Sequence, residues 1–252
     1  MQFFLSAIAW LFDPQNYAAG TQSPLPIQDR IGEHLFYVFA SVAIAAIIAL
    51  PLGFFIGHTG RGRQFVIGFT GAVRALPTLG LLMALFVVIG NVVPFTQTAF
   101  IASFVAFVVL AIPSMLAGAY AGLESVSRET IDAARASGMT EFQILFRVEI
   151  PLALPLIISG FRASTLQVIS TVTLGAYLGL TGLGPYIFTG LTTRNFPLML
   201  TGAILVTALA LVVDAVFAIV QRAVVPRGVV AASGRTPDSP RTSSRPAVST
   251  TP

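Results

Sequence analysis

Few side chains in this sequence could perform covalent or metal chemistry. The chain of 252 residues contains no cysteine and no lysine, and its two histidines, His34 and His58, are far apart. Without cysteine there is no thiol nucleophile and no cysteine metal site, and without lysine there is no phosphate-binding loop of the Walker type. Each histidine lies alone at the end of an apolar run, so we expect an interfacial residue rather than a ligand. The sequence predicts no catalytic residue, no metal site and no cofactor bound by this chain.

Two opposite charges lie inside apolar runs. Arg162 and Asp214 each fall about 12 to 17 Å from the end of a run, at about 1.5 Å per helical residue. A charge inside a membrane is costly and usually pairs or faces a cavity. We expect a structural Arg162–Asp214 ion pair rather than a contact with a transported molecule.

Four other residues could line or gate a path. Arg74, Pro77 and Thr78 mark the entry to an apolar segment, where proline would bend a helix. Tyr177 could offer its aromatic face to a cation, although anchoring at a membrane interface explains a tyrosine there equally well.

The elements that carry these residues must lie in a membrane. Hydrophobic residues make up 55% of the chain and charged residues only 10%, against roughly 25% charged in soluble domains. We expect an all-α polytopic protein with five spans, because about 20 apolar residues suffice to cross a bilayer. The expected spans are residues 34–57, 76–92, 95–121, 151–176 and 197–220, with a re-entrant or interfacial hairpin at 177–195.

The arginines predict the orientation. Ten of them fall on one side of the expected spans if residues 125–150 are cytoplasmic, and only Arg30 and Arg194 fall on the other. Cytoplasmic loops are enriched in positive charge, so the N-terminus is expected outside and the C-terminus inside. This explains the basic composition without nucleic-acid binding. The expected organisation is an extracytoplasmic interfacial segment at 1–30, a transmembrane domain at 31–225 and a disordered cytoplasmic tail at 226–252.

The cytoplasmic loop, residues 125–150, is long, polar and patterned. It predicts a first short helix that Ser127 caps and Gly138 ends. Thr140 should cap a second one, with Gln143 at the capping-box position. Pro151 is expected to close the second helix and to begin the next span.

The side chains of this loop favour docking on a partner. Ala133 and Ala134 offer a smooth surface, and Phe142, Leu145 and Phe146 form an apolar stripe at helical spacing. A charged rim surrounds the stripe, as in a helix that enters a groove. Periodicity alone leaves open whether the stripe packs only on the protein's own spans.

A resemblance to a known family favours docking on a partner over packing on the protein's own spans. Asp132-Ala133-Ala134, then Gly138, then the stretch that ends in Ile150-Pro151, resembles the cytoplasmic loop of permease subunits in bacterial ATP-binding-cassette (ABC) importers. That family has Glu-Ala-Ala, three residues, Gly, nine residues and Ile-x-Leu-Pro, and here Asp replaces Glu. Segments 57–61, 74–82, 150–156 and 178–184 are similar to the osmoprotectant branch, which serves glycine betaine, choline, carnitine or proline betaine.

The resemblance implies a type I importer permease in the plasma membrane of a bacterium. It implies two copies of an ABC ATPase subunit that bind ATP and Mg²⁺, a second permease (a paralogue or the same chain) and an extracytoplasmic solute-binding protein. Asp132, Ala133, Ala134 and Gly138 would form the part that contacts the ATPase. Alternatives are a permease for methionine or another amino acid, a passive channel or scaffold, and an intramembrane hydrolase. The sequence contains no Gly-x-Ser-x-Gly turn, which a serine hydrolase would use.

Overall fold

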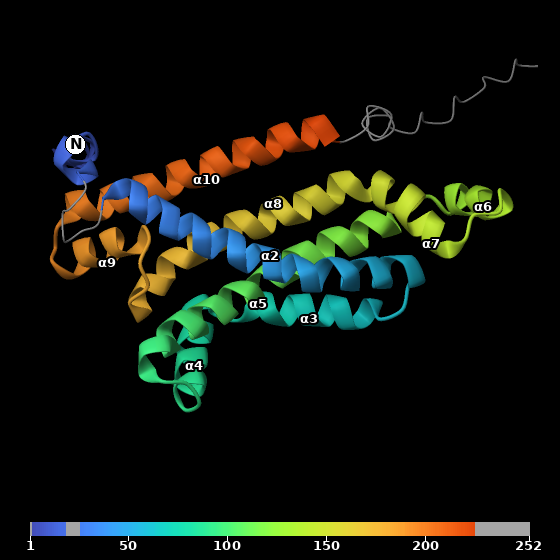
Figure 1. Cartoon of the computed structure of the whole chain (residues 1–252), viewed down its shortest axis with the longest axis horizontal. Coiled ribbons are helices and arrows are strands. Elements are labelled where there is room, and N and C mark those ends of the chain that lie inside the picture. Colours follow the sequence, from blue (N-terminus) through green and yellow to red (C-terminus); the bar gives the residue numbers. More distant parts are fainter. Residues whose placement is uncertain (1, 19–25, 225–252) are drawn as a thin grey trace, which may run out of the picture.

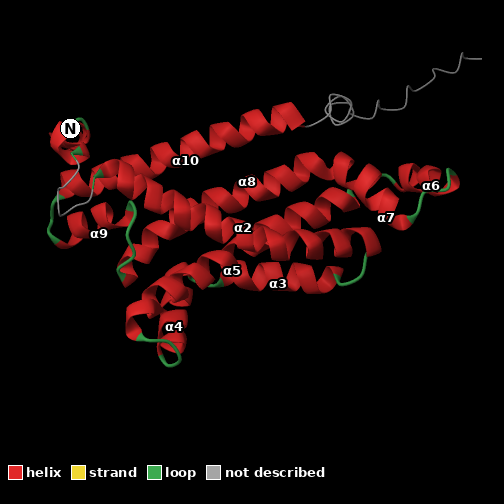
Figure 2. Cartoon of the chain, in the orientation of Figure 1, coloured by secondary structure: helices red, strands yellow, loops and turns green. Residues whose placement is uncertain are grey.

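The long helices run side by side along the molecule. The computed structural model describes residues 2–18 and 26–224, and every regular element within them is a helix, as Figure 2 shows. The long helices are α2 (Ile27–Thr59), α5 (Phe95–Glu124), α8 (Ile150–Gly175) and α10 (Phe196–Val224). Each is long and apolar enough to cross a membrane, α8 as part of the continuous helix Glu141–Leu178, which confirms a polytopic all-α protein. The expected tail at 226–252 lies outside the described residues.

Shorter elements lie at the two ends of this bundle, except α3, which runs alongside α5 (Figure 1). They are α1 (Gln2–Leu11), the 3₁₀ turn η1 (Pro14–Tyr17), α3 (Arg63–Ala75), α4 (Thr78–Gly90), α6 (Arg128–Ala136), α7 (Glu141–Ile144), the π-helical turn η2 (Leu145–Glu149), η3 (Ala176–Leu178) and α9 (Gly184–Thr192). The end that carries α6 and α7 also carries the last turn of α2 and the start of α3. We call it the loop end.

The core lies between α2, α5 and α8. Its buried side chains include Val38, Ala106, Met115 and Val168. Glycines bring α5 and α8 into backbone contact, since a Cβ atom built on Gly118 would lie 2.7 Å from Cα of Gly160. Such small residues drive association of helices in a membrane, because lipid tails are as apolar as the side chains.

The second span differs from the expected straight helix over 76–92. It begins earlier, at α3, and consists of α3 and α4 bent by 92°. Leu76 is extended (φ −70°, ψ 129°), because a residue before proline avoids the helical region and Pro77 has no N–H to donate. Arg63, Gln64 and Arg74 dilute the apolar character of α3, which hid it from a search for apolar runs. With this bent pair counted as one span, the structure has five.

The interrupted segment before the last span is a turn followed by α9. Gly179 and Gly182 take left-handed conformations (φ 88° and 92°) and turn the chain after η3. α9 then packs against α10, where the Cβ position of Gly202 lies 2.8 Å from Tyr186 Cβ. The N-terminal helix α1 covers the same region, and its Trp10 makes an edge contact with Tyr186 at 5.5 Å between ring centroids.

Candidate functional site

The first helix of the cytoplasmic loop has the expected caps. The Ser127 hydroxyl accepts a hydrogen bond from the backbone N–H of Thr130 at 3.3 Å, at the start of α6. Gly138 follows α6 with φ 82°, and its N–H donates to the Arg135 carbonyl at 2.9 Å. A side chain at this φ would be strained, so the turn depends on glycine.

The second helix does not stop at Pro151 as expected. Thr140 caps α7, and Gln143 completes the capping box. The chain then continues without a break through η2 into α8. Pro151 lies at the start of α8, and the preceding turn widens to π geometry, which accommodates proline's missing N–H and its ring. The loop therefore joins α8 as one continuous helix.

The apolar stripe is divided between two surfaces. Phe142 and Phe146 are 71% and 50% exposed, and their ring centroids lie 4.5 Å apart. Leu145 instead packs with Ile150 against the cluster around Leu123, so that part of the expected stripe faces the spans. The two phenylalanines form an apolar ridge that the described residues of this chain leave exposed.

The neighbouring small residues are also accessible. Asp132, Ala133 and Gly138 are exposed, and Ala134 is half-buried. They lie on α6 and its following turn, at the loop end of the molecule (Figure 1). A partner could therefore reach the whole segment from outside.

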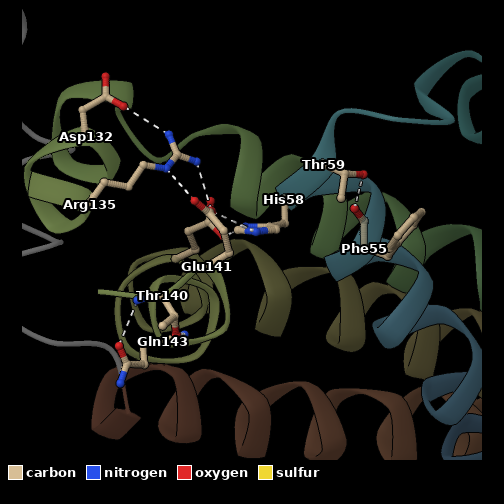
Figure 3. Close-up of polar contacts among 9 residues, drawn as sticks. Phe55, His58, Thr59, Asp132, Arg135, Thr140, Glu141 and Gln143 are labelled. Carbon is tan, nitrogen blue, oxygen red and sulfur yellow. Dashed lines mark hydrogen bonds and ion pairs between the residues drawn. The ribbon is translucent and has the colours of Figure 1, made fainter. Parts of the chain in front are cut away.

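Ionic contacts hold this loop in shape, as Figure 3 shows. Arg135 donates to both carboxylate oxygens of Glu141, at 2.7 and 3.0 Å, and to Asp132 Oδ1 at 3.2 Å. The hydrogen bonds to Glu141, next the charge of Glu141 and then, more weakly, the charge of Asp132 raise the pKa of Arg135 above its ordinary value. The contacts fix α6 relative to α7 across the turn at Gly138.

His58, which stands alone in the sequence, belongs to an ionic network in the structure. It lies in the last turn of α2, where Nδ1 is 2.5 Å from Glu149 Oε2 and Nε2 is 3.4 Å from Glu141 Oε2. Glu149 is only 2% exposed. Sequence reasoning missed this cluster, although the eight-residue spacing of the two glutamates, about two helical turns, was a signal for a shared face. The contacts link α2 to the loop.

His34 is a core residue rather than an interfacial one. Its ring is fully buried, with Nδ1 accepting from the Leu183 N–H at 3.3 Å and Nε2 lying 3.0 Å from the Ile169 carbonyl. These partners place the proton of a neutral ring on Nε2. His34 ties α2 to α8 and to the turn before α9.

Arg162 and Asp214 form a two-bond ion pair between α8 and α10. Arg162 Nε donates to Oδ1 and Nη2 to Oδ2 of Asp214, both at 2.6 Å. The side chains keep 34% and 30% of their surface exposed in the isolated chain. The pair is therefore open on one side at membrane depth.

The four expected pathway residues do not form one cluster. Arg74, at the end of α3, donates to the Ser114 hydroxyl at 3.4 Å, and Ser114 lies 3.4 Å from Gln167 Oε1 on α8. Pro77 and Thr78 lie at the bend before α4. Tyr177 is 60% exposed and contacts Phe188 of α9. These polar contacts from Arg74 through Ser114 to Gln167 join α3, α5 and α8, and we call them the track. The spacing of the three residues in the sequence did not predict it.

The comparisons with known proteins decide the family. Residues 49–227 match the family described as "Binding-protein-dependent transport system inner membrane component". The chain belongs to this family. It is 34% identical to a glycine betaine/carnitine/choline transport system permease protein of Bacillus subtilis (strain 168), over 79% of this chain and 89% of that protein. It is 33% identical to a carnitine transport permease protein of Listeria monocytogenes, over 72% and 80% respectively.

Solved structures share the fold. The inward-facing MetNI methionine ABC transporter matches with a TM-score of 0.67 and 24% identity, over 78% of this chain and 94% of that chain. An amino acid ABC transporter with histidines matches with a TM-score of 0.65 and 18% identity, over 87% and 97%. These neighbours confirm the type I importer permease fold.

Membership in this family fixes the class of protein. The chain is a multi-pass permease subunit in the bacterial plasma membrane, and ATP hydrolysis belongs to a partner ATPase. The family also implies a substrate-binding partner and a second permease. A passive channel, a scaffold and an intramembrane hydrolase are therefore excluded as its role.

Proposed function

We propose that this chain is the permease of an ABC importer for quaternary amine osmoprotectants such as glycine betaine, choline or carnitine. The observation that carries the proposal is the 34% identity to a glycine betaine/carnitine/choline permease, over 89% of that protein. The methionine and amino acid transporters support only the fold, because their identities are 24% and 18%. An importer of amino acids is the alternative.

Uptake measurements test the solute. The permease, its ATPase and its binding protein are reconstituted in proteoliposomes with ATP inside. We expect ATP-dependent uptake of labelled glycine betaine, carnitine or choline, and no uptake of methionine. Uptake of methionine alone would contradict the proposal and favour the alternative.

We propose that the cytoplasmic loop is where the ATPase docks. The exposed Phe142 and Phe146 would enter a groove on the ATPase, with Asp132, Ala133, Ala134 and Gly138 against its surface and Ile150 and Pro151 joining the loop to α8. This is supported by the exposure of the ridge and by its charged rim. ATP and Mg²⁺ would bind to two ATPase copies, one beneath each permease.

Copurification tests this docking. Phe142→Ala should reduce recovery of the ATPase with the permease by about tenfold, since removing a central aromatic anchor costs about 1 to 2 kcal/mol or more. Phe65→Ala is the matched control, because Phe65 is also 71% exposed but lies on α3. Ala134→Trp and Gly138→Arg should abolish recovery. Full recovery with both of these variants would contradict docking at the loop.

We propose that the second permease covers the apolar side of α10. Only 6% of the most apolar window of this helix is buried in the isolated chain. The ion pair of Arg162 and Asp214, which would hold α10 on α8, is open on one side. Native mass spectrometry of the purified complex would show whether the second permease is this chain or a paralogue.

We propose that the transported solute passes the track of Arg74, Ser114 and Gln167, with Pro77 and Thr78 forming a movable bend beside it. Arg74 is exposed and has no carboxylate among its described contacts, and an arginine at membrane depth usually faces a cavity or a partner. Tyr177 would offer an aromatic face to the ammonium group. Arg74→Gln should raise the KM for uptake by a larger factor than the factor by which it lowers the rate of ATP hydrolysis.

A further inference from the structure

Both ring nitrogens of His58 face carboxylates. Nδ1 is 2.5 Å from Glu149 Oε2, and Nε2 is 3.4 Å from Glu141 Oε2. Each ring nitrogen therefore lies next to one carboxylate, Nδ1 next to Glu149 of η2 and Nε2 next to Glu141 of α7. We call this arrangement, Glu149–His58–Glu141, the His58 bridge.

The His58 bridge joins elements that the backbone does not connect at this end. The carboxylates come from α7 and η2, whereas His58 lies in the last turn of α2. Beyond His58 the chain turns at Gly60 and Gly62, both with positive φ, and leaves toward α3. The α2 end is thus held to the cytoplasmic loop by side chains (Figure 3).

The surroundings make the bridge a firm contact. The side chain of Glu149 is only 3% exposed, and that of His58 is 16% exposed, so water screens their attraction weakly. Glu141 is held from its other side by Arg135 of α6. The charged groups that line the adjacent pocket of about 380 Å³ include Arg63, Glu124 and Arg128. The bridge therefore extends the loop's own ionic network onto a membrane helix.

The two spans next to the loop are consequently connected to it in different ways. α8 continues from the loop as one helix, so any displacement of the loop reaches α8 through the backbone. α2 has no such continuity, although it packs along α5 and α8 in the core. Leu50 and Phe54 of α2 pack against the same apolar cluster as Leu145 and Ile150, and the His58 bridge adds a direct ionic contact between α2 and the loop.

We infer that His58 is a second coupling residue, which makes α2 move together with α8 when the ATPase displaces the loop. The inference rests on the proposed docking of an ATPase on this loop. His58 is a positioning residue: it touches neither ATP nor the solute. Its loss should separate ATP hydrolysis from transport rather than abolish either partner's binding.

The ratio of solute transported to ATP hydrolysed tests the inference in the reconstituted transporter. His58→Gln removes the ring that contacts both carboxylates and keeps a similar size, and we expect this ratio to fall at least about fivefold, the lower end of the usual range of coupling. His58→Arg should restore much of it, because a guanidinium can also bind two carboxylates. Arg63→Gln is the matched control: it removes the exposed 3.0 Å pair with Glu124 at the same end and should leave the ratio unchanged.

A distance measurement shows whether α2 follows the loop. The chain has no cysteine, so spin labels attach to it only at Phe55→Cys in α2 and Ser137→Cys in the loop, and their separation within one chain is measured. We expect the same separation in the ATP-free and vanadate-trapped transporter, and two different separations once His58→Gln is added. An unchanged separation and ratio in His58→Gln would overturn the inference, and so would loss of ATPase copurification, which would make His58 a folding residue.

The two proposals fail in distinguishable ways. If the unsubstituted transporter takes up no osmoprotectant, the proposed function is wrong. If it takes up an osmoprotectant while His58→Gln keeps the normal ratio of transport to hydrolysis, only the role of His58 is wrong.

Discussion

The helices α5 and α10 are alike in length and apolar composition but opposite in burial. α5 has 30 residues and α10 has 29, yet 56% of the most apolar window of α5 is buried against 6% for α10. Small residues of α5 meet α2 and α8, as at Gly118 and Ala119. The middle of α10 instead exposes Leu211, Val212 and Val216. Hydropathy places a helix in the membrane, whereas close backbone approach determines which helices pack together.

The largest expected effect breaks the close contact of α5. Gly118→Ala places a Cβ atom 2.7 Å from Cα of Gly160 and 2.8 Å from the Leu156 carbonyl oxygen. The helices must separate, which should cost about 3 kcal/mol, at the upper end for overpacking. The loss of stability is measured by thermal unfolding in detergent, with size-exclusion chromatography as the readout of folded protein. Gly68→Ala on α3, with open space around it, should not lower the melting temperature, and an equal loss there would refute the packing argument.

A smaller effect is expected when a side chain is shortened on α5 and, for comparison, on α10. Met115→Ala removes a fully buried side chain of α5 and should lower stability by about 2 kcal/mol, the lower end for such cavities. Leu211→Ala on α10 removes a side chain that is 64% exposed and should change stability by less than about 0.5 kcal/mol. The same detergent melting assay compares the two. Equal losses would mean that α10 is packed in the isolated chain as tightly as α5.

The smallest effect concerns the polar contact that attaches α10 to α8. Asp214→Asn leaves one acceptor oxygen, so one bond from Arg162 is lost and the other loses its charge assistance. We expect a drop in melting temperature smaller than that of Met115→Ala, since the pair is partly open. The exchanged pair Arg162→Asp with Asp214→Arg should recover part of it. If Asp214→Asn and the exchanged pair melt alike, the pair does not stabilise the attachment of α10.

Local features of this protein could be predicted from the sequence. The caps at Ser127, Gly138 and Thr140 depend on residues within a few positions of one another, so their side chains and the required φ determined them. The Arg162–Asp214 contact also followed from sequence, because two isolated opposite charges at similar depth have few other partners. The resemblance of the loop led to the family that the comparisons show.

Features that join distant parts of the chain could not be predicted. The partners of His58 and His34 lie 91 and 135 residues away, and a lone histidine beside an apolar run carries no sign of them. The division of the stripe, with Leu145 inward and Phe142 outward, depends on where α2 and α5 lie. The helix α3 was missed because its polar residues lowered its hydropathy.

The sequence by itself determined that this chain crosses a membrane, which end carries the polar loop, and which local turns the loop makes. These properties arise from transfer of side chains into lipid and from short-range backbone geometry. Only the tertiary structure decided that α5 is central and α10 peripheral, and that His58 binds the loop. Close packing and buried ionic contacts depend on which surfaces meet, and that is known only when all helices are in place.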